Sequence, residues 1–144
     1  SRPDPDPPDG ASLEARPYPA SPSSLTDDMV AYVTAFERAY RHNAFLGQYG
    51  AAARTVVLRR TDGRAAPVGS SPDSDPDAVM VAIRYDLTTG TGRSSVDPRD
   101  RWDIRVVYYV DENVALRAQY HGVADALRFE PDPRTQGELV ACFD

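Results

Sequence analysis

Residues 26–50, TDDMVAYVTAFERAYRHNAFLGQYG, decide the fold of this chain, because their apolar residues recur at spacings of four, three and four. That spacing is typical of one face of an α-helix. The apolar face consists of Met29, Val33, Phe36 and Tyr40. Thr26 has the hydroxyl of an N-cap residue and precedes two aspartates, so we expect the helix to begin beside it. Gly47 and Gly50 are expected to end it.

After this helix the apolar residues alternate with polar ones, which is typical of strands with one buried face. We expect strands at residues 54–60, 78–87, 103–110, 114–120 and 138–143. Residues 111–113 separate the third strand from the fourth and predict a tight hairpin. Residues 62–77 are rich in Gly, Pro, Ser and Asp and predict a mobile loop, and TTGTGR at 88–93 predicts a turn.

One helix followed by antiparallel strands predicts an α+β fold, in which a single long amphipathic helix packs on a curved antiparallel sheet of four to five strands. This element order is cystatin-like, although a likeness of fold carries no function. Residues 1–24 contain seven of the prolines and predict an extended N-terminal arm, ahead of a single domain at residues 25–144. Within the arm, residues 11–18 are either an edge strand or part of a solvated spacer.

Every basic residue of the chain is an arginine. The 16 Lys+Arg residues include no lysine and stand against 22 Asp+Glu, for a net charge of -6. Because concentrated salt screens repulsion between carboxylates, and because arginine is less strongly hydrated than lysine, we interpret this composition as salt adaptation. The alternative is an arginine-favouring genome in an ordinary medium. No cluster of positive charge predicts a nucleic-acid partner, and no apolar run approaches the roughly 20 residues of a membrane span.

Catalytic signals are weak. The two histidines, His42 and His121, are far apart in the sequence, and neither stands next to a second metal ligand. No HExxH, CxxC or GxSxG motif occurs. A small enzyme that uses the open face of the sheet therefore lacks a base with a matched partner. The hypothesis of an enzyme would gain support if Asp103 or His121 lay deep in a pocket.

Metal and cofactor signals are weak as well. Asp73, Asp75 and Asp77 alternate as in the first half of a calcium loop, but the central glycine and the closing glutamate are missing. The glycines of residues 88–93 follow a strand as in a phosphate-binding loop, but a third glycine and a following helix are missing. We therefore expect no metal and no cofactor. Cys142 is the single cysteine, so no internal disulfide can form.

Arginines and tyrosines on the predicted strands leave two interpretations open. The arginines either line an anion-binding face or pair across strands with carboxylates. They are Arg59, Arg60, Arg84, Arg105 and Arg117. Tyr85, Tyr109 and Tyr120 either form an exposed contact face of the sheet or fill its core. Glu37 and Arg41 are four residues apart and predict an ion pair on the solvent side of the helix.

The stretch VAYVTAFERAYRHNAFLGQYG, residues 30–50, resembles a block in small, uncharacterised exported lipoproteins of haloarchaea. In that group a similar helix follows an acidic, proline-containing spacer next to a lipid-modified cysteine. The resemblance implies export and a membrane tether, and it transfers no catalytic residue. The chain starts at Ser1, so an anchoring cysteine would precede it, and both a processed exported chain and a trimmed fragment fit this start.

We therefore expect a non-enzymatic, exported protein, extracellular or at the cell surface, that assembles into filaments or other homo-oligomers. Its N-terminal arm would add as a strand to the sheet of a neighbouring copy and link the subunits head to tail. The arm residues expected to do so are Leu13, Glu14, Ala15, Arg16 and Tyr18. The alternative is a monomeric, surface-tethered lipoprotein whose sheet binds a ligand or a partner protein.

Overall fold

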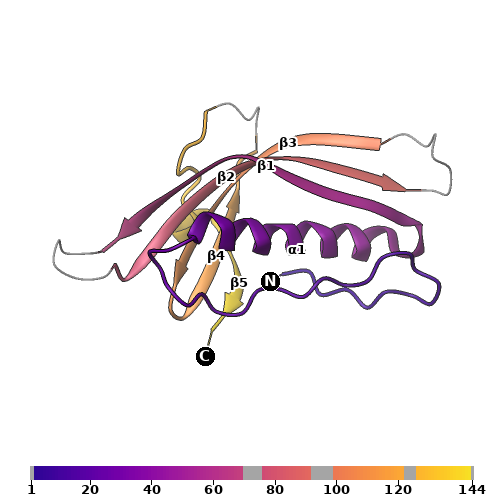
Figure 1. Cartoon of the computed structure of the whole chain (residues 1–144), viewed down its shortest axis with the longest axis horizontal. Helices are drawn as coiled ribbons and strands as arrows, with labels where there is room; N and C mark the ends of the chain where they lie inside the picture. The colour runs from indigo at the N-terminus through magenta and orange to yellow at the C-terminus, as the bar shows by residue number, and fades with distance from the viewer. Residues whose placement is uncertain (1, 70–75, 92–98, 122–125, 144) are drawn as a thin grey trace.

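A computed structural model describes residues 2–69, 76–91, 99–121 and 126–143 of the chain. One long helix packs on a five-stranded antiparallel sheet of strand order β1-β2-β3-β4-β5, so the fold is α+β as expected. Each strand therefore pairs with the next one in sequence (Figure 1). The elements are α1 (Met29–Tyr49), η1 (Gly50–Ala52), β1 (Ala53–Val68), β2 (Ala78–Thr91), β3 (Arg99–Asp111), β4 (Val114–Gln119), α2 (Pro133–Gln136) and β5 (Glu138–Cys142).

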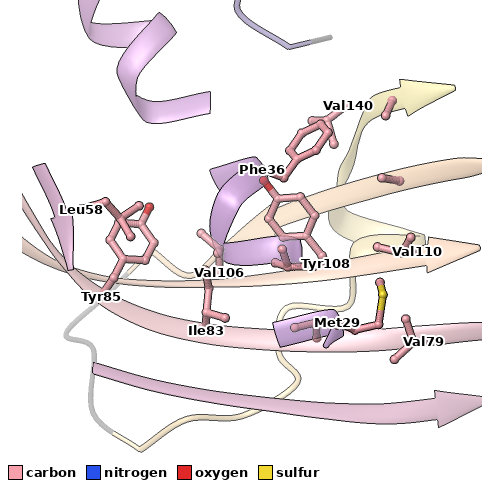
Figure 2. Close-up of a cluster of buried hydrophobic side chains, with 14 of the residues drawn as sticks. Met29, Phe36, Leu58, Val79, Ile83, Tyr85, Val106, Tyr108, Val110 and Val140 are labelled. Carbon is pink, nitrogen blue, oxygen red and sulfur yellow. The ribbon is translucent and has the colours of Figure 1, made fainter. Parts of the chain in front are cut away.

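The core lies between α1 and the sheet, and the predicted apolar face of the helix forms one side of it. Met29, Val33 and Phe36 are buried, and Tyr40 is half-buried against the same cluster. Figure 2 shows Phe36 next to Tyr108, and their ring centroids are 5.7 Å apart. The sheet side consists of alternate residues of β2 and β3, namely Val79, Val81, Ile83, Tyr85, Val106, Tyr108 and Val110. Removing this apolar surface from water is what holds the helix on the sheet.

The other face of the sheet is covered in part, which the alternation in β2 does not predict. Met80 and Ala82 of β2 pack with Val107 of β3 against Leu127, which follows β4 in the chain. A strand covered on both faces has a continuous apolar run instead of an alternation. AVMVAI at residues 78–83 is such a run, and all six of its residues are buried.

The helix begins later than its capping signal predicts. Asp28 is the N-cap residue, with a φ of 55° and no capping hydrogen bond from its side chain. Thr26 lies instead in a turn where the Oγ of Ser24 accepts hydrogen bonds from the backbone amides of Thr26 and Asp27. The prediction of Thr26 as the N-cap was therefore wrong, because the hydroxyl of Ser24 takes the local backbone donors.

The first two strands are longer than predicted. β1 continues to Val68 and β2 to Thr91, through parts of residues 62–77 and 88–93 that were expected to be a loop and a turn. The two strands pair antiparallel along nearly their whole length. The hydrogen bonds of this ladder outweigh the local turn preference of glycine and proline. The remainder of both segments lies outside the described residues.

Two glycines are required by the geometry around α1. Gly50 is the C-cap residue with a φ of 52°, a left-handed conformation that favours glycine, and its amide donates to the carbonyl of Leu46. This confirms that Gly50 ends the helix, whereas Gly47, expected to do so as well, lies inside it. A Cβ atom at Gly63 of β1 would lie 2.5 Å from Cγ1 of Val30. The helix therefore approaches β1 more closely than a larger residue at Gly63 would allow.

Residues 2–28 form no helix or strand, and this segment lies along α1 (Figure 1, indigo). Asn43 of the helix holds it, because its Oδ1 accepts a hydrogen bond from the amide of Arg16 at 2.7 Å and its Nδ2 donates to the carbonyl of Arg16 at 2.9 Å. The ring of Tyr18 packs on Phe36 with centroids 5.0 Å apart. The edge strand expected at residues 11–18 is therefore not formed in this chain, because side chains of α1 satisfy the backbone groups that a strand would use.

Candidate functional site

A buried carboxylate lies near the middle of α1. Arg117 of β4 binds both oxygens of Glu37, with its Nε 2.7 Å from Oε1 and its Nη2 2.8 Å from Oε2. The hydroxyl of Tyr108 donates to Oε1 at 2.7 Å, and that of Tyr85 donates to Oε2. Arg41, one turn further along the helix, places its Nε 3.3 Å from Oε2. A single side chain of α1 thus connects to β2, β3 and β4.

This cluster overturns one prediction and decides between two interpretations of another residue. Glu37 was expected on the solvent side of the helix with Arg41, but it is fully buried and faces the sheet. It stands four residues after Val33, so the spacing that marks the apolar face includes it as well. The sequence left Tyr85 either on an exposed contact face or in the core, and its exposed fraction of 0% places it in the core. Its position two residues after Ile83 places it on the inward face of β2.

The ionisation of the cluster suits a structural role. Burial alone would raise the pKa of Glu37, but the guanidiniums of Arg117 and Arg41 and the hydrogen bond from Tyr85 outweigh it and lower the pKa to about 2. Burial, with the charge of Glu37, raises the pKa of Tyr85 and of Tyr108. At neutral pH the carboxylate is therefore ionised and both tyrosines are protonated. A carboxylate with so low a pKa is a poor general base.

Arg41 connects this buried cluster to a surface pocket. Its Nε lies 2.8 Å from the hydroxyl of Tyr85, and its Nη2 lies 2.7 Å from Oε1 of Gln119. Its side chain is 19% exposed, and both Arg41 and Gln119 line the pocket. The cluster therefore fixes the guanidinium on one side while the other side meets solvent.

The pocket has a volume of about 630 Å³ and is lined by the C-terminal half of α1, by β2 and β3, and by residues at the end of β4. It forms at the end of β3 where the side chains on the core face of the strand become exposed to solvent. Along that face Tyr108 and Val106 are buried, Ile104 is half-buried, and Trp102 is 45% exposed. The same sheet face that makes the core thus opens into a cavity at one end.

Aromatic and polar side chains both line the pocket. Phe45 and Tyr49 project from α1 with ring centroids 4.6 Å apart, and Trp102 lies on β3. Tyr49 is 43% exposed, so two large aromatic side chains of the pocket are open to solvent. The polar lining includes Arg41 and Gln119, whose mutual hydrogen bond holds both in place.

Asp103 and His121, the two residues whose burial in a pocket would favour an enzyme, do not lie deep in this one. Asp103 lines it, but its side chain is 42% exposed and its carboxylate accepts hydrogen bonds from Nε and Nη2 of Arg84. That hydrogen bonding lowers the pKa of Asp103. His121 lines the pocket too and is exposed. His42 lies elsewhere, with its Nε2 2.7 Å from the carbonyl oxygen of Glu14.

The three tyrosines expected on one contact face lie in three different places. Tyr85 is in the core, and Tyr109 is half-buried with the cluster on the opposite face of the sheet. Tyr120 lines the pocket, and the guanidinium carbon of Arg105 lies 3.8 Å from the centroid of its ring. The three residues therefore do not share a contact face, because Tyr85 pairs with Ile104 on the core face of the sheet, whereas Tyr109 pairs with Met80 on the opposite face.

Three of the strand arginines pair with carboxylates. Arg59 contacts Asp86 at 2.7 Å, and the pairs of Arg84 and Arg117 are given above. Arg105 lines the pocket, and Arg60 donates to the hydroxyl of Thr34. Pairing across strands is confirmed for Arg59 and Arg84. Arg117 pairs mainly with Glu37 of the helix, and its Nη1 also lies 3.9 Å from Oε1 of Glu138 on the neighbouring strand.

The arm residues singled out from the sequence are held only in part. Leu13 and Tyr18 are half-buried, whereas Glu14, Ala15 and Arg16 are exposed. Arg16 is bound through its backbone, and the hydroxyl of Tyr18 donates to the carbonyl of Pro3 at 2.5 Å. This segment is therefore held mainly by its backbone groups and by the ring of Tyr18, and less by its charged side chains.

Within the described ranges, no group of three or more His, Cys, Asp or Glu side chains is placed to hold a metal ion. Asp73 and Asp75 of the calcium-like stretch lie outside those ranges. Cys142 is exposed and not in a disulfide. None of the helices in the part of the chain that the structure describes is long and apolar enough to cross a bilayer.

Several residues of the pocket were not singled out from the sequence, among them Phe45, Trp102 and Gln119. Trp102 did offer a signal, because the only tryptophan of the chain stands in phase with the inward row of β3. The sequence contains no such signal for Phe45 and Gln119, because they line the same pocket only when the helix is packed on the sheet. No family model matches the chain, and no curated protein or solved structure matches it.

Proposed function

We propose that this protein is a non-enzymatic binding module at the outer surface of a salt-adapted cell, and that the pocket beside Arg41 holds its ligand. The observation that carries the proposal is a pocket of about 630 Å³ that combines exposed aromatic rings with a few fixed polar groups. Small-molecule sites typically measure about 300–1,000 Å³ and have this kind of lining. Tyr120, expected to contact a partner, is part of the same lining.

The state of the titratable groups favours binding over catalysis. Glu37 is locked by two arginines and two tyrosines and does not line the pocket. Asp103 is bound by Arg84, and His121 is exposed to solvent. A general base needs a pKa near the working pH and a partner that orients it. The pKa of Glu37 and that of Asp103 are lowered. Among the described residues, no side chain forms a hydrogen bond that would orient His121.

The surface location is supported by composition and by resemblance. A net charge of -6 with arginine as the only basic residue suits concentrated salt, and residues 30–50 resemble exported haloarchaeal lipoproteins. A lipid attached ahead of Ser1 is part of this proposal, as is the cystatin-like order of helix and strands. A lipid mass on the N-terminal peptide of the full-length protein purified from its host, measured by mass spectrometry, would support the tether, and its absence would reject it.

Binding in the pocket can be tested with a neutral aromatic probe, N-phenyl-1-naphthylamine, whose fluorescence rises in apolar sites. We expect saturable binding to one site per chain, and we expect Trp102→Ala to weaken it at least tenfold. Leu139→Ala is the matched control, because Leu139 is also 45% exposed but lies on β5, outside the pocket. Absence of saturable binding, or equal weakening by both variants, would reject the pocket as a ligand site.

Assembly through residues 1–24 is the second candidate, and the seat of this segment on α1 favours it. The hydrogen bonds of Asn43 to Arg16 and the contact of Tyr18 with Phe36 could be made with a neighbouring copy in the same way. Exchange of the segment between copies would link subunits without a new interface. Strand addition to the sheet of a neighbour would instead require those hydrogen bonds to break.

The two candidates differ in the size of the particle. Light scattering in 2 M KCl separates a monomer from a filament or oligomer, and electron microscopy identifies filaments directly. Deletion of residues 1–20 should dissolve any assembly that depends on this segment. Assemblies that persist after the deletion would reject the second candidate and leave the pocket proposal untouched.

A further inference from the structure

The charge inside the pocket differs from that of the whole protein. The chain has a net charge of -6. The charged side chains that line the pocket are two arginines, Arg41 and Arg105, and one carboxylate, Asp103. That carboxylate already accepts two hydrogen bonds from Arg84. An anion entering the pocket therefore meets the guanidinium of Arg41, and the one carboxylate of the lining, Asp103, is already bound by Arg84.

The buried cluster leaves Arg41 with unused binding capacity. Glu37 is bound at both oxygens by Arg117, at 2.7 and 2.8 Å, while Arg41 reaches only one oxygen at 3.3 Å. The Nε and Nη2 of Arg41 bond to Tyr85 and Gln119. Among the residues that the structure describes, its Nη1 has no hydrogen-bond partner. The guanidinium is thus rigid and still has donor protons to offer.

Gln119 adds a second donor. Its Oε1 accepts the hydrogen bond from Arg41 at 2.7 Å, so the amide group is oriented with its NH₂ as the remaining group. Gln119 is half-buried and lines the pocket beside Arg41. A guanidinium and an amide NH₂ side by side present donors only. A carboxylate, which accepts hydrogen bonds at both oxygens, is the complementary group.

The rest of the pocket suits a flat apolar body. Trp102 and Tyr49 are 45% and 43% exposed, and the rings of Tyr49 and Phe45 are 4.6 Å apart. Leu87 and Ile104 add apolar surface to the lining. Aromatic side chains that are open to solvent gain most by covering a planar ligand, because stacking adds to the burial of area.

On these grounds we propose that the pocket binds a small amphipathic carboxylate, whose carboxyl group is held by Arg41 and Gln119 and whose flat apolar body lies against Trp102 and Tyr49. This inference rests on the proposed binding function and names the ligand class of the same site. A site for a neutral sugar would not need the charge of Arg41, and a site for an inorganic anion would not need the aromatic side chains.

The test compares two ligands of the same shape, naphthalene-2-carboxylate and naphthalene-2-methanol, by calorimetric titration of the full chain at pH 7. In 0.1 M KCl we expect the carboxylate to bind at least tenfold more tightly than the alcohol. In 2 M KCl the preference should shrink, because salt screens the charge of Arg41, while the contribution of the rings remains. Acetate alone should bind too weakly to measure.

Matched variants assign the anchor. Gln119→Glu places a carboxylate next to Arg41 and should abolish the preference for the charged ligand, while its own pairing with Arg41 keeps the fold. Gln48→Glu adds the same charge at an exposed position of the pocket and should keep most of the preference. Thermal unfolding of both variants checks that neither has lost its structure.

Each outcome has a distinct meaning. If neither naphthalene ligand nor the neutral fluorescent probe binds, the proposed function and this inference both fail. If acid and alcohol bind equally, the binding function stands and the carboxylate anchor is wrong. If the preference survives Gln119→Glu, or if Gln48→Glu removes it equally, then Arg41 and Gln119 are not the anchor.

Discussion

At the scale of single residues, Glu37 determines how the helix is attached to the sheet. Its two oxygens accept hydrogen bonds from Arg117, Tyr85 and Tyr108, which belong to three different strands. A buried charge without partners is expensive, so each of these contacts is needed for the carboxylate to be tolerated in the core. Apolar side chains could slide past one another, whereas this network allows one register of α1 on the sheet.

Replacing Glu37 by Gln should therefore destabilise the protein strongly. The variant leaves the guanidinium of Arg117, buried at 5% exposure, with only the carboxylate of Glu138 at 3.9 Å as a counter-charge. Breaking a buried pair from one side typically lowers the free energy of unfolding by about 3–5 kcal/mol. Denaturant unfolding at pH 7 measures the loss. Glu112→Gln, at the exposed turn between β3 and β4, is the control and should change little. A loss below about 1 kcal/mol, the size of a surface pair, would contradict a structural role for Glu37.

The same carboxylate predicts how stability depends on acid. The pKa of Glu37 is lowered to about 2 in the folded chain from 4.5, so its contribution is fully present above pH 4.5. The contribution is lost as the pH falls from there toward about 2. The expected loss is on the order of 3 kcal/mol. Unfolding midpoints between pH 5 and pH 2 at constant ionic strength should show it, and Glu37→Gln should lack that part of the slope. Parallel curves for both proteins would contradict the prediction.

At the scale of elements, α1 is in contact with protein on two sides. The sheet covers its apolar face, and residues 2–20 lie along it (Figure 1). Asn43 is 1% exposed beneath this segment and satisfies both backbone groups of Arg16. The order of a segment rich in proline thus depends on side chains of the helix, because proline itself provides no donor for a ladder.

Asn43→Ala should release this segment. Both hydrogen bonds to Arg16 would be lost and its carbonyl and amide would return to water, so residues 2–20 should be cut by a protease much faster than in the parent chain. Limited proteolysis followed by mass spectrometry gives the rate. Gln48→Ala, on the same helix but exposed, is the control. Equal cleavage of the two variants would show that Asn43 does not hold the segment.

The contact between α1 and β1 leads to a second prediction at this scale. A Cβ at Gly63 would lie 2.5 Å from Cγ1 of Val30, so Gly63→Ala should lower the free energy of unfolding by about 1–3 kcal/mol. Val30→Ala removes the clashing atom. The double variant should therefore be more stable than the sum of the two single effects predicts, by at least about 0.5 kcal/mol. Additive effects in this double-mutant cycle would mean that the helix moves aside instead.

At the scale of the whole molecule, charge should couple stability to salt. The chain carries 22 acidic residues against 16 arginines, and their net repulsion opposes compactness in dilute buffer. We expect the unfolding temperature to rise as KCl increases from 0.1 M to 2 M, because the repulsion is screened. Sucrose at equal osmolarity is the control for effects unrelated to charge. A fall in the unfolding temperature with KCl would contradict salt adaptation.

Much of the architecture was predictable because it depends on local periodicity. The spacing of Met29, Val33 and Phe36 predicted which face of the helix is buried, and that prediction is confirmed. The strands were located but their ends were not, since pairing carried β1 through Gly63 and Pro67. Turn preferences are worth less than the hydrogen bonds of a long antiparallel ladder, so the local signal was overridden.

By itself, the sequence determined the order of the long helix and the five strands and the acidic, lysine-free composition, because periodicity and composition need no long-range contact. Only the tertiary structure decided that Glu37 is buried and that Arg41 ends at a pocket. The reason is distance along the chain: Glu37 and Arg117 are 80 residues apart, and Arg41 and Gln119 are 78 apart. Nothing in either local stretch encodes the other, so their meeting exists only once the helix is packed on the sheet.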